Sequence, residues 1–271
     1  MTQKRHEILG RALKTSVEVC FDCMAQEEAM YIEFTAPGKP HQAFARDSQI
    51  RWAVRMAVMQ HLGYGPIENL PKRLNDGVDK CLEYFFGDWW RADEADARGL
   101  DKSRPDRALR WFDILPNALL LCGLSDRWDD LAKICSWFDD RVQLEYRGGL
   151  NENADMVLYL CIAASMNPSP PADMDAMLAY VKSGRARRPK LLCAAWEAAR
   201  GNDQKLFDKS FKSSVQQFVK SDAEDAPNPY FWVAVRQSFV WLLAERNGLT
   251  FPELPEQLDA AVVRRQTIGL A

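Results

Sequence analysis

Apolar residues recur at steps of three and four along residues 105–140, with one interruption near Gly123. This spacing places them on one face of an α-helix, so the pattern predicts two amphipathic helices joined by a tight turn. Gly123 is expected to end the first helix, because glycine adopts positive φ at low cost, and Ser125 or Asp126 to cap the second. So short a link predicts an antiparallel helical hairpin. Pro116, inside the first predicted helix, lacks the N–H of other residues and is expected to kink or split it.

The same periodicity predicts helices on both sides of this hairpin. They span residues 3–26, 46–62, 71–90, 153–166, 172–183, 189–200, 202–220 and 229–248. The last is apolar on nearly every side, so other helices should surround it, with Asn228 and Pro229 at its start and Gly248 at its end. Residues 31–35 alternate like a strand, but one short strand without a partner is unstable.

These patterns predict an all-α fold, an irregular array of about nine to eleven helices built from antiparallel helix hairpins. No repeat of constant spacing is present, so the array is expected to be solenoid-like at most loosely. The charged stretch 88–106 divides an N-terminal helical part, residues 1–104, from a C-terminal helical part, residues 105–271. We expect the two parts to form one continuous globular domain.

Composition narrows the class of protein. The chain has 271 residues, 47% of them hydrophobic, which is enough for a large core. A net charge of −3 and a pI near 5.8 argue against a nucleic-acid binder, which needs a basic face. The sequence has neither the long apolar run of a membrane span nor a signal peptide, so we expect a cytoplasmic protein. The seven cysteines lie mostly in apolar helical stripes, which predicts buried, reduced thiols.

The sequence offers three weak candidates for chemistry. Cys20 and Cys23 form a CxxC pair, but they lie in the second half of a predicted helix without a second ligand pair, which favours incidental thiols over a redox or zinc site. His61 lacks the helical neighbours of a metal site and is expected to interact with the dipole at its helix C-terminus. Aspartate pairs at 129–130 and 139–140 invite comparison with all-helical prenyl-transferring enzymes, yet a further acid of that motif is missing. We expect no catalytic residue, no metal and no cofactor.

Charge is distributed unevenly along the chain. Residues 75–101 hold eight acids against three bases, and residues 125–145 hold six against three. Such runs also occur on ordinary solvated surfaces, but together with aromatic residues they can form a face that binds a protein. The candidate partner-binding residues are Asp88, Trp90, Asp93, Glu94, Asp126, Asp129, Asp130 and Tyr146.

The C-terminal half resembles a known group of proteins in the order of its segments. A mid-chain apolar helix is followed by an acidic helix, then by an Ala-rich helix with a short turn and a Phe-spaced helix, then by a closing apolar helix. The segments are FDILPNALLLCGLSDRWDDLAKI, LLCAAWEAARGNDQKLFDKSFKSSVQQF and YFWVAVRQSFVWLLAERNGLTFPELPEQL. This order is similar to that of the helical immunity proteins of bacterial polymorphic-toxin systems, especially the immunity protein 49 family and more loosely the proteins that guard against PoNe-type DNase toxins.

The resemblance implies a non-enzymatic antidote that binds a cognate toxin domain and blocks its active site or its access to substrate. Because such toxins are often basic nucleases, an acidic face would steer their association. We expect a protein partner, and neither nucleic acid nor a membrane. The alternative is a helical-repeat scaffold or adaptor that binds a peptide or protein in a groove. An enzyme of the metal-diphosphate kind would instead require the paired aspartates to point into a deep pocket.

Overall fold

The computed structural model describes residues 4–11, 16–34, 42–87, 111–138, 154–166, 174–221 and 229–270, and these residues form helices and no strand. The α-helices are α1 (Arg5–Ile8), α2 (Val17–Phe34), α3 (Gln42–Leu62), α4 (Leu70–Phe86), α8 (Trp111–Leu124), α9 (Trp128–Ser136), α11 (Ala154–Met166), α12 (Met174–Ser183), α13 (Arg187–Arg200), α14 (Gln204–Ser221), α15 (Val235–Arg246) and α16 (Glu256–Asp259). Two 3₁₀ turns, η1 (Pro229–Trp232) and η2 (Gln266–Ile268), complete the described elements. Ten of these α-helices have seven or more residues, so the all-α prediction is confirmed.

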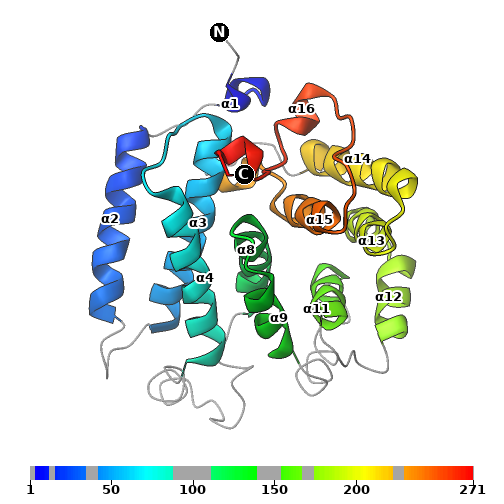
Figure 1. Ribbon diagram of the computed structural model, residues 1–271, viewed down its shortest axis with the longest axis horizontal. Helices are drawn as coiled ribbons and strands as arrows, with labels where there is room; N and C mark the ends of the chain where they lie inside the picture. The colour runs from blue at the N-terminus through cyan, green and yellow to red at the C-terminus, as the bar shows by residue number, and fades with distance from the viewer. Residues whose placement is uncertain are drawn as a thin grey trace.

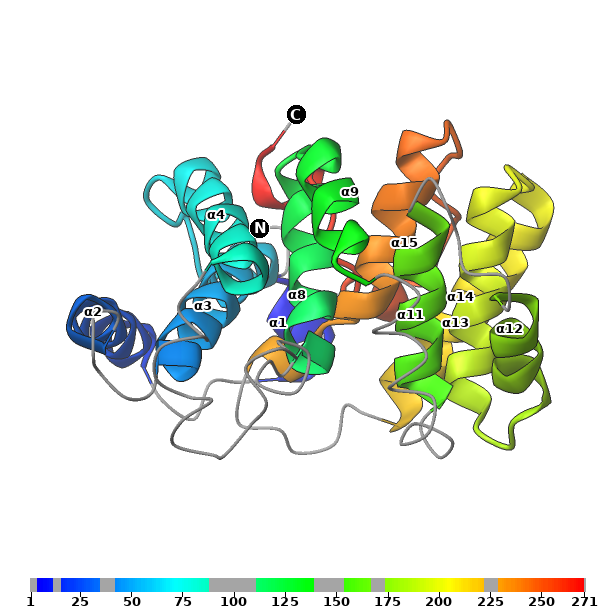
Figure 2. The ribbon, with the colours of Figure 1, turned by 90° about the horizontal axis from the view of Figure 1, so that it is seen from below.

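The helices are arranged in a row that follows the chain order with one exception (Figures 1 and 2). The row runs from α2 at one edge, through α3, α4, α8 and α9, to α11, α12, α13 and α14 at the other. The exception is α15, which returns to the middle and packs between α8 and α13. This insertion interrupts any simple run of stacked hairpins. The predicted boundary between residues 104 and 105 lies outside the described residues, but α3 and α4 on its one side pack against α8 on the other.

The central position of α15 explains its apolar sequence. Its residues 237–244 are all buried, as predicted for a helix surrounded by others. The helix ends as predicted, since Gly248 has a φ of +85°. Its predicted start at Pro229 is wrong. The chain forms η1 there, and the N–H of Ala234 donates to the carbonyl of Ala261 at 2.7 Å, so α15 begins only at Val235.

The hairpin of α8 and α9 is present, but its turn differs from the prediction. Gly123 does not end α8, which continues to Leu124. A Cβ at Gly123 would lie 2.9 Å from Leu242 Cδ1, so this glycine allows α15 to pack closely against α8. The left-handed residue of the turn is Asp126, with a φ of +58°, and the N-cap of α9 is Arg127, which makes no side-chain capping bond.

Two further helix predictions need correction. α8 runs unbroken past Pro116, so the proline does not split it. The single helix predicted over residues 3–26 is also wrong, because Gly10 has a φ of +65° and ends the short helix α1. α2 starts later and extends to Phe34, so residues 31–34 are helical and form no strand.

The cysteines of this fold are reduced thiols. None of the seven forms a disulfide, and five of them are buried in helices, as predicted. Burial raises the pKa of the Cys135 and Cys193 thiols to about 12, so both are protonated at neutral pH. The buried five are Cys81, Cys122, Cys135, Cys161 and Cys193.

The C-terminal segment, residues 249–270, is bound to α3 through buried side chains. His61 lies 2.8 Å from the carbonyl of Ala260 through Nε2 and 2.7 Å from the hydroxyl of Thr267 through Nδ1. Gln60 adds a hydrogen bond from its side-chain amide to the carbonyl of Ile268. Burial lowers the pKa of His61 to about 3, so the ring is neutral at pH 7, and its main contacts are these hydrogen bonds and not the predicted interaction with the helix dipole. The neutral ring donates to Ala260 through Nε2 and accepts from Thr267.

This buried histidine gives a pH dependence of stability. Because its pKa is lower in the folded protein than in the unfolded chain, its contribution is complete above the unfolded pKa of about 6.5 and is lost as the pH falls toward about 3. Between pH 7 and pH 5 we expect the native protein to lose about 2 kcal/mol more stability than His61→Gln, whose side chain does not titrate. Urea unfolding of both proteins at pH 5, 6 and 7 measures this. Equal losses in the two proteins would contradict a neutral, buried His61.

Candidate partner-binding site

The structure places three of the predicted partner-binding residues and brings them together. Asp126, Asp129 and Asp130 lie in the turn between α8 and α9 and in the first turn of α9. Asp126 and Asp129 are exposed, whereas Asp130 is half-buried. The other predicted site residues, Asp88, Trp90, Asp93, Glu94 and Tyr146, lie outside the described residues.

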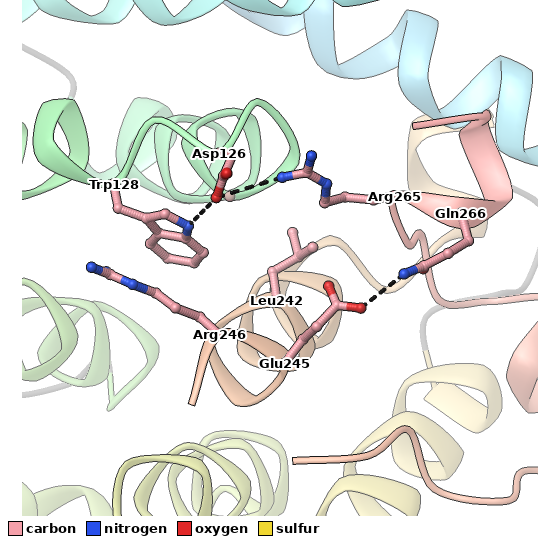
Figure 3. Close-up of a pocket in the computed structure, with 8 residues that line it drawn as sticks. Asp126, Trp128, Leu242, Glu245, Arg246, Arg265 and Gln266 are labelled. Atoms are coloured by element: carbon pink, nitrogen blue, oxygen red, sulfur yellow. Dashed lines mark hydrogen bonds and ion pairs between the residues drawn. The ribbon is translucent and has the colours of Figure 1, made fainter. Parts of the chain in front are cut away.

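A cleft of about 330 Å³ opens beside this turn (Figure 3). It lies between the start of α9, the end of α15 and the C-terminal segment. Its lining combines an apolar floor with a charged rim. The lining residues are Gly123, Asp126, Trp128, Leu242, Glu245, Arg246, Arg265 and Gln266.

Trp128 is held in a defined orientation at the mouth of this cleft. Its indole N–H donates to the carboxylate of Asp126 at 2.8 Å, and the guanidinium of Arg246 lies 4.6 Å from the centre of its ring. Arg265 approaches the same carboxylate to 3.5 Å, yet the Asp126 side chain remains 64% exposed. Figure 3 shows these groups converging from three segments. Tryptophan and arginine are the residue types that most often dominate protein interfaces, so the arrangement fits a protein contact.

Glu245 stabilises the opposite rim of the cleft. Its carboxylate accepts a hydrogen bond from the side-chain amide of Gln266 at 2.9 Å, which ties the end of α15 to η2. The cleft therefore has two acids and two arginines on its rim, and much of this charge is engaged within the rim itself. Such a rim suits a polar protein surface.

The two remaining aspartates have different environments. Asp130 binds Arg127 at 2.6 Å, and Arg127 also binds Asp79 of α4 at 2.7 Å. Asp130 is therefore part of the contact between α4 and α9. Asp129 is exposed and has no ion-pair partner among the described residues. Of the predicted acids in α9, Asp129 is the one most accessible to a partner.

The acidic character of α4 is weaker than its composition predicts. Asp76 lies 3.5 Å from Lys72, Asp79 binds Arg127, and Glu83 binds Arg46 at 2.8 Å. These acids are thus balanced by bases from neighbouring positions. The described part of the first acidic run contributes less negative charge to a partner than counting along the sequence suggests.

A second hollow, of about 520 Å³, lies between α2, α3 and α4. Ala53, Met56 and Gly77 are buried and form its floor, and charged side chains from α2 and α4 form its rim. The side-chain amide nitrogen of Gln49 is buried at its wall and has no hydrogen-bond partner among the described residues. The hollow therefore combines an apolar floor, a charged rim and one buried amide without a partner in the described part of the chain.

The candidates for catalysis and metal binding gain no support from geometry. Among the residues that the structure describes, no three His, Cys, Asp or Glu side chains are grouped to hold a metal ion. Cys20 and Cys23 lie within α2, where burial and the neighbouring Cys23 raise the pKa of the Cys20 thiol. Asp129 is exposed, Asp130 is bound to Arg127, and residues 139–140 lie outside the described residues.

Of the residues that line the cleft, only Asp126 was predicted to bind a partner; Trp128 was predicted as part of the apolar face of its helix. Glu245, Arg246, Arg265 and Gln266 come from segments more than a hundred residues after Asp126, and no local pattern connects the two regions. One signal was available, because Glu245 and Arg246 are adjacent charges directly after the buried stretch of α15. Charged residues at the end of an otherwise buried helix indicate that this end reaches the surface.

Comparisons with protein-family models, with curated proteins and with solved structures find no match for this chain. None of the described helices is both long and apolar enough to cross a membrane. The resemblance to immunity proteins therefore stays a prediction, and the all-α architecture is the property of the chain that the structure shows.

Proposed function

We propose that the chain is a non-enzymatic immunity-type protein that binds a cognate toxin domain and masks its active site. The observation that carries the proposal is the surface at the start of α9, where Trp128 is oriented by Asp126 and Arg246 and the next residue, Asp129, is exposed. An aromatic side chain that is already held in place loses little conformational entropy on binding. The flanking carboxylates would attract a basic toxin and orient it.

The second candidate function is that of a helical scaffold that binds a peptide in the hollow between α2, α3 and α4. The buried, unpaired amide of Gln49 favours it, because this group would donate a hydrogen bond to a peptide carbonyl. The insertion of α15 between α8 and α13 is not expected in a regular helical repeat, so it argues against a repeat scaffold. Gln49→Leu, which removes the amide and keeps an apolar side chain of similar size, should weaken peptide binding while leaving toxin binding at α9 intact.

Rescue of cells from the toxin tests the proposed function. The chain is co-expressed with the C-terminal domain of whatever large protein is encoded beside its gene, and survival is counted with the native protein and with Asp126→Lys/Asp129→Lys. Native protein should restore growth, and the charge-reversed variant should bind about 10- to 100-fold more weakly and rescue poorly, because repulsion replaces attraction at the anchor.

The control for this experiment is Asp175→Lys, which reverses an exposed carboxylate on α12, a helix that packs on α11 and α13. It should rescue as well as the native protein. Circular dichroism confirms that the variants are folded. Full rescue by the α9 variant would show that this surface does not contact the toxin. If the cells die although the native protein is expressed, the immunity function itself is contradicted.

A further inference from the structure

The outer surface of α2 has an unusual composition for an edge helix. Its charged residues are all acids, with no lysine or arginine in 18 residues. Three of the six large hydrophobic side chains that are exposed in the described part of the chain also belong to α2. The acids are Glu18, Asp22, Glu27, Glu28 and Glu33. The exposed hydrophobic residues are Val19, Met30 and Ile32.

The inner side of α2 is occupied by the rest of the protein. Met24 is buried against the core, and α2 packs along α3 at the edge of the row (Figures 1 and 2). Glu27 accepts a hydrogen bond from the indole of Trp52, and Glu28 pairs with Arg73 of α4 at 3.0 Å. These two acids therefore contribute to the packing of α2 against α3 and α4.

The outer side carries an apolar stripe. Val19, Cys23 and Met30 are spaced by four and seven residues, which places them in line along the helix. All three are exposed, Val19 by 44% and Met30 by 38%. Ile32 lies on the other flank of α2 and does not belong to this stripe.

An acidic stripe runs beside the apolar one. Glu18 and Asp22 are four residues apart, Glu33 follows three turns later on the same side, and all three are exposed. Asp22, Glu33 and Glu18 have no ion-pair partner among the described residues. Their charges are therefore available to a partner.

We propose that the outer face of α2 is a docking surface for a basic amphipathic helix of another protein. The apolar stripe of that helix would pack on Val19, Cys23 and Met30, and its lysines or arginines would pair with the acidic stripe. At about 1.5 Å per residue, α2 offers a surface roughly 27 Å long. This inference concerns a different part of the molecule from the start of α9 and does not depend on the immunity function.

Charge selects the occupant of this surface. A second copy of the chain would bring two α2 helices together, each with five carboxylates and no base. Like charges across an interface are repulsive, so such a dimer is disfavoured. A positively charged helix meets the same surface with attraction.

A synthetic peptide tests the proposal on the full chain. The probe is an 18-residue peptide of leucine and lysine with its leucines on one helical face, and its control has the same composition in a scrambled order. Fluorescence anisotropy should show binding of the amphipathic peptide at least tenfold tighter than that of the control. Hydrogen exchange should slow in residues 17–34 when the peptide binds.

Three pairs of substitutions locate the binding. Val19→Lys/Met30→Lys and Asp22→Lys/Glu33→Lys should each weaken binding of the amphipathic peptide at least tenfold. The matched pair Asp175→Lys/Glu253→Lys changes the net charge as much as the second pair does, at exposed positions outside α2, and should weaken it far less. Any of three results would overturn the proposal. The two pairs of acid-to-lysine substitutions could weaken binding equally, or the scrambled peptide could bind as tightly as the amphipathic one. The third is a dimer of the native chain in sedimentation that Met30→Lys dissociates.

Discussion

Replacing Gly77 by valine is expected to lower the free energy of unfolding by about 3 kcal/mol, the upper part of the range for an overpacked core. Gly77 lies in α4 and faces Ala53 of α3, and a Cβ at position 77 would lie 2.5 Å from the Cβ of Ala53. Leu121 of α8 lies 3.2 Å from the same point. Because Cβ atoms are fixed to the backbone, α3 and α4 must move apart. Chemical unfolding of Gly77→Val against Gly184→Val, whose Cβ would make only ordinary contacts at 3.5 Å, measures the effect.

A double substitution separates this contact from a general effect of removing glycine. Alanine at position 77 gains about 1 kcal/mol in helix propensity but still meets Ala53, so we expect a net loss of stability. Adding Ala53→Gly removes the opposing Cβ, and the double variant should be more stable than Gly77→Ala alone. Strictly additive effects of the two substitutions would contradict a direct contact between α3 and α4 at this point.

Replacing Asp155 by alanine is expected to destabilise the protein by about 3 kcal/mol, because a half-buried charge network loses the carboxylate that binds two of its arginines. Asp155 in the first turn of α11 binds Arg188 of α13 at 2.6 Å and Arg236 of α15 at 3.1 Å, and its side chain is 18% exposed. Burial alone would raise the pKa of Asp155, but Arg236 and Arg188 outweigh it and lower the pKa. The carboxylate is therefore charged at neutral pH and joins three helices.

Urea unfolding of Asp155→Ala and of Asp175→Ala measures this loss. Asp175 occupies the first turn of α12, as Asp155 does that of α11, but it is exposed, so its removal should cost less than about 1 kcal/mol. Similar losses for the two variants would mean that Asp155 acts only on the dipole of its own helix. Asp155 would then not link α11 to α13 and α15.

Helix positions were predictable because a helix that is buried on one side has apolar residues at every third or fourth position of its sequence. α4 shows this best, since Leu74, Val78, Cys81 and Phe85 are spaced like a helical face and are all buried. The turns were less predictable, because their conformation depends on tertiary contacts. Gly123 had every local property of a helix terminator, yet it serves the close approach of Leu242.

The candidate site was predictable only where it is local. Asp126 and Asp129 could be found from their position after the central helix, and both are exposed there. Arg246 and Arg265 reach the same cleft because α15 inserts beside α8, and a long-range insertion of that kind leaves no periodic signal. The acids of α2 escaped notice for another reason, because the predicted helix stopped at residue 26 and the acidic stripe extends to Glu33.

The stoichiometry of inhibition tests the central claim, a masking function without catalysis, most directly. The purified chain is titrated into a fixed concentration of the toxin domain, and the remaining toxin activity is measured. Masking predicts a linear fall to zero at about one equivalent, and recovery of activity when the complex is separated by denaturation and the toxin is refolded. Complete and lasting inactivation by a small fraction of one equivalent would contradict the claim, because the chain would then be acting on the toxin as an enzyme.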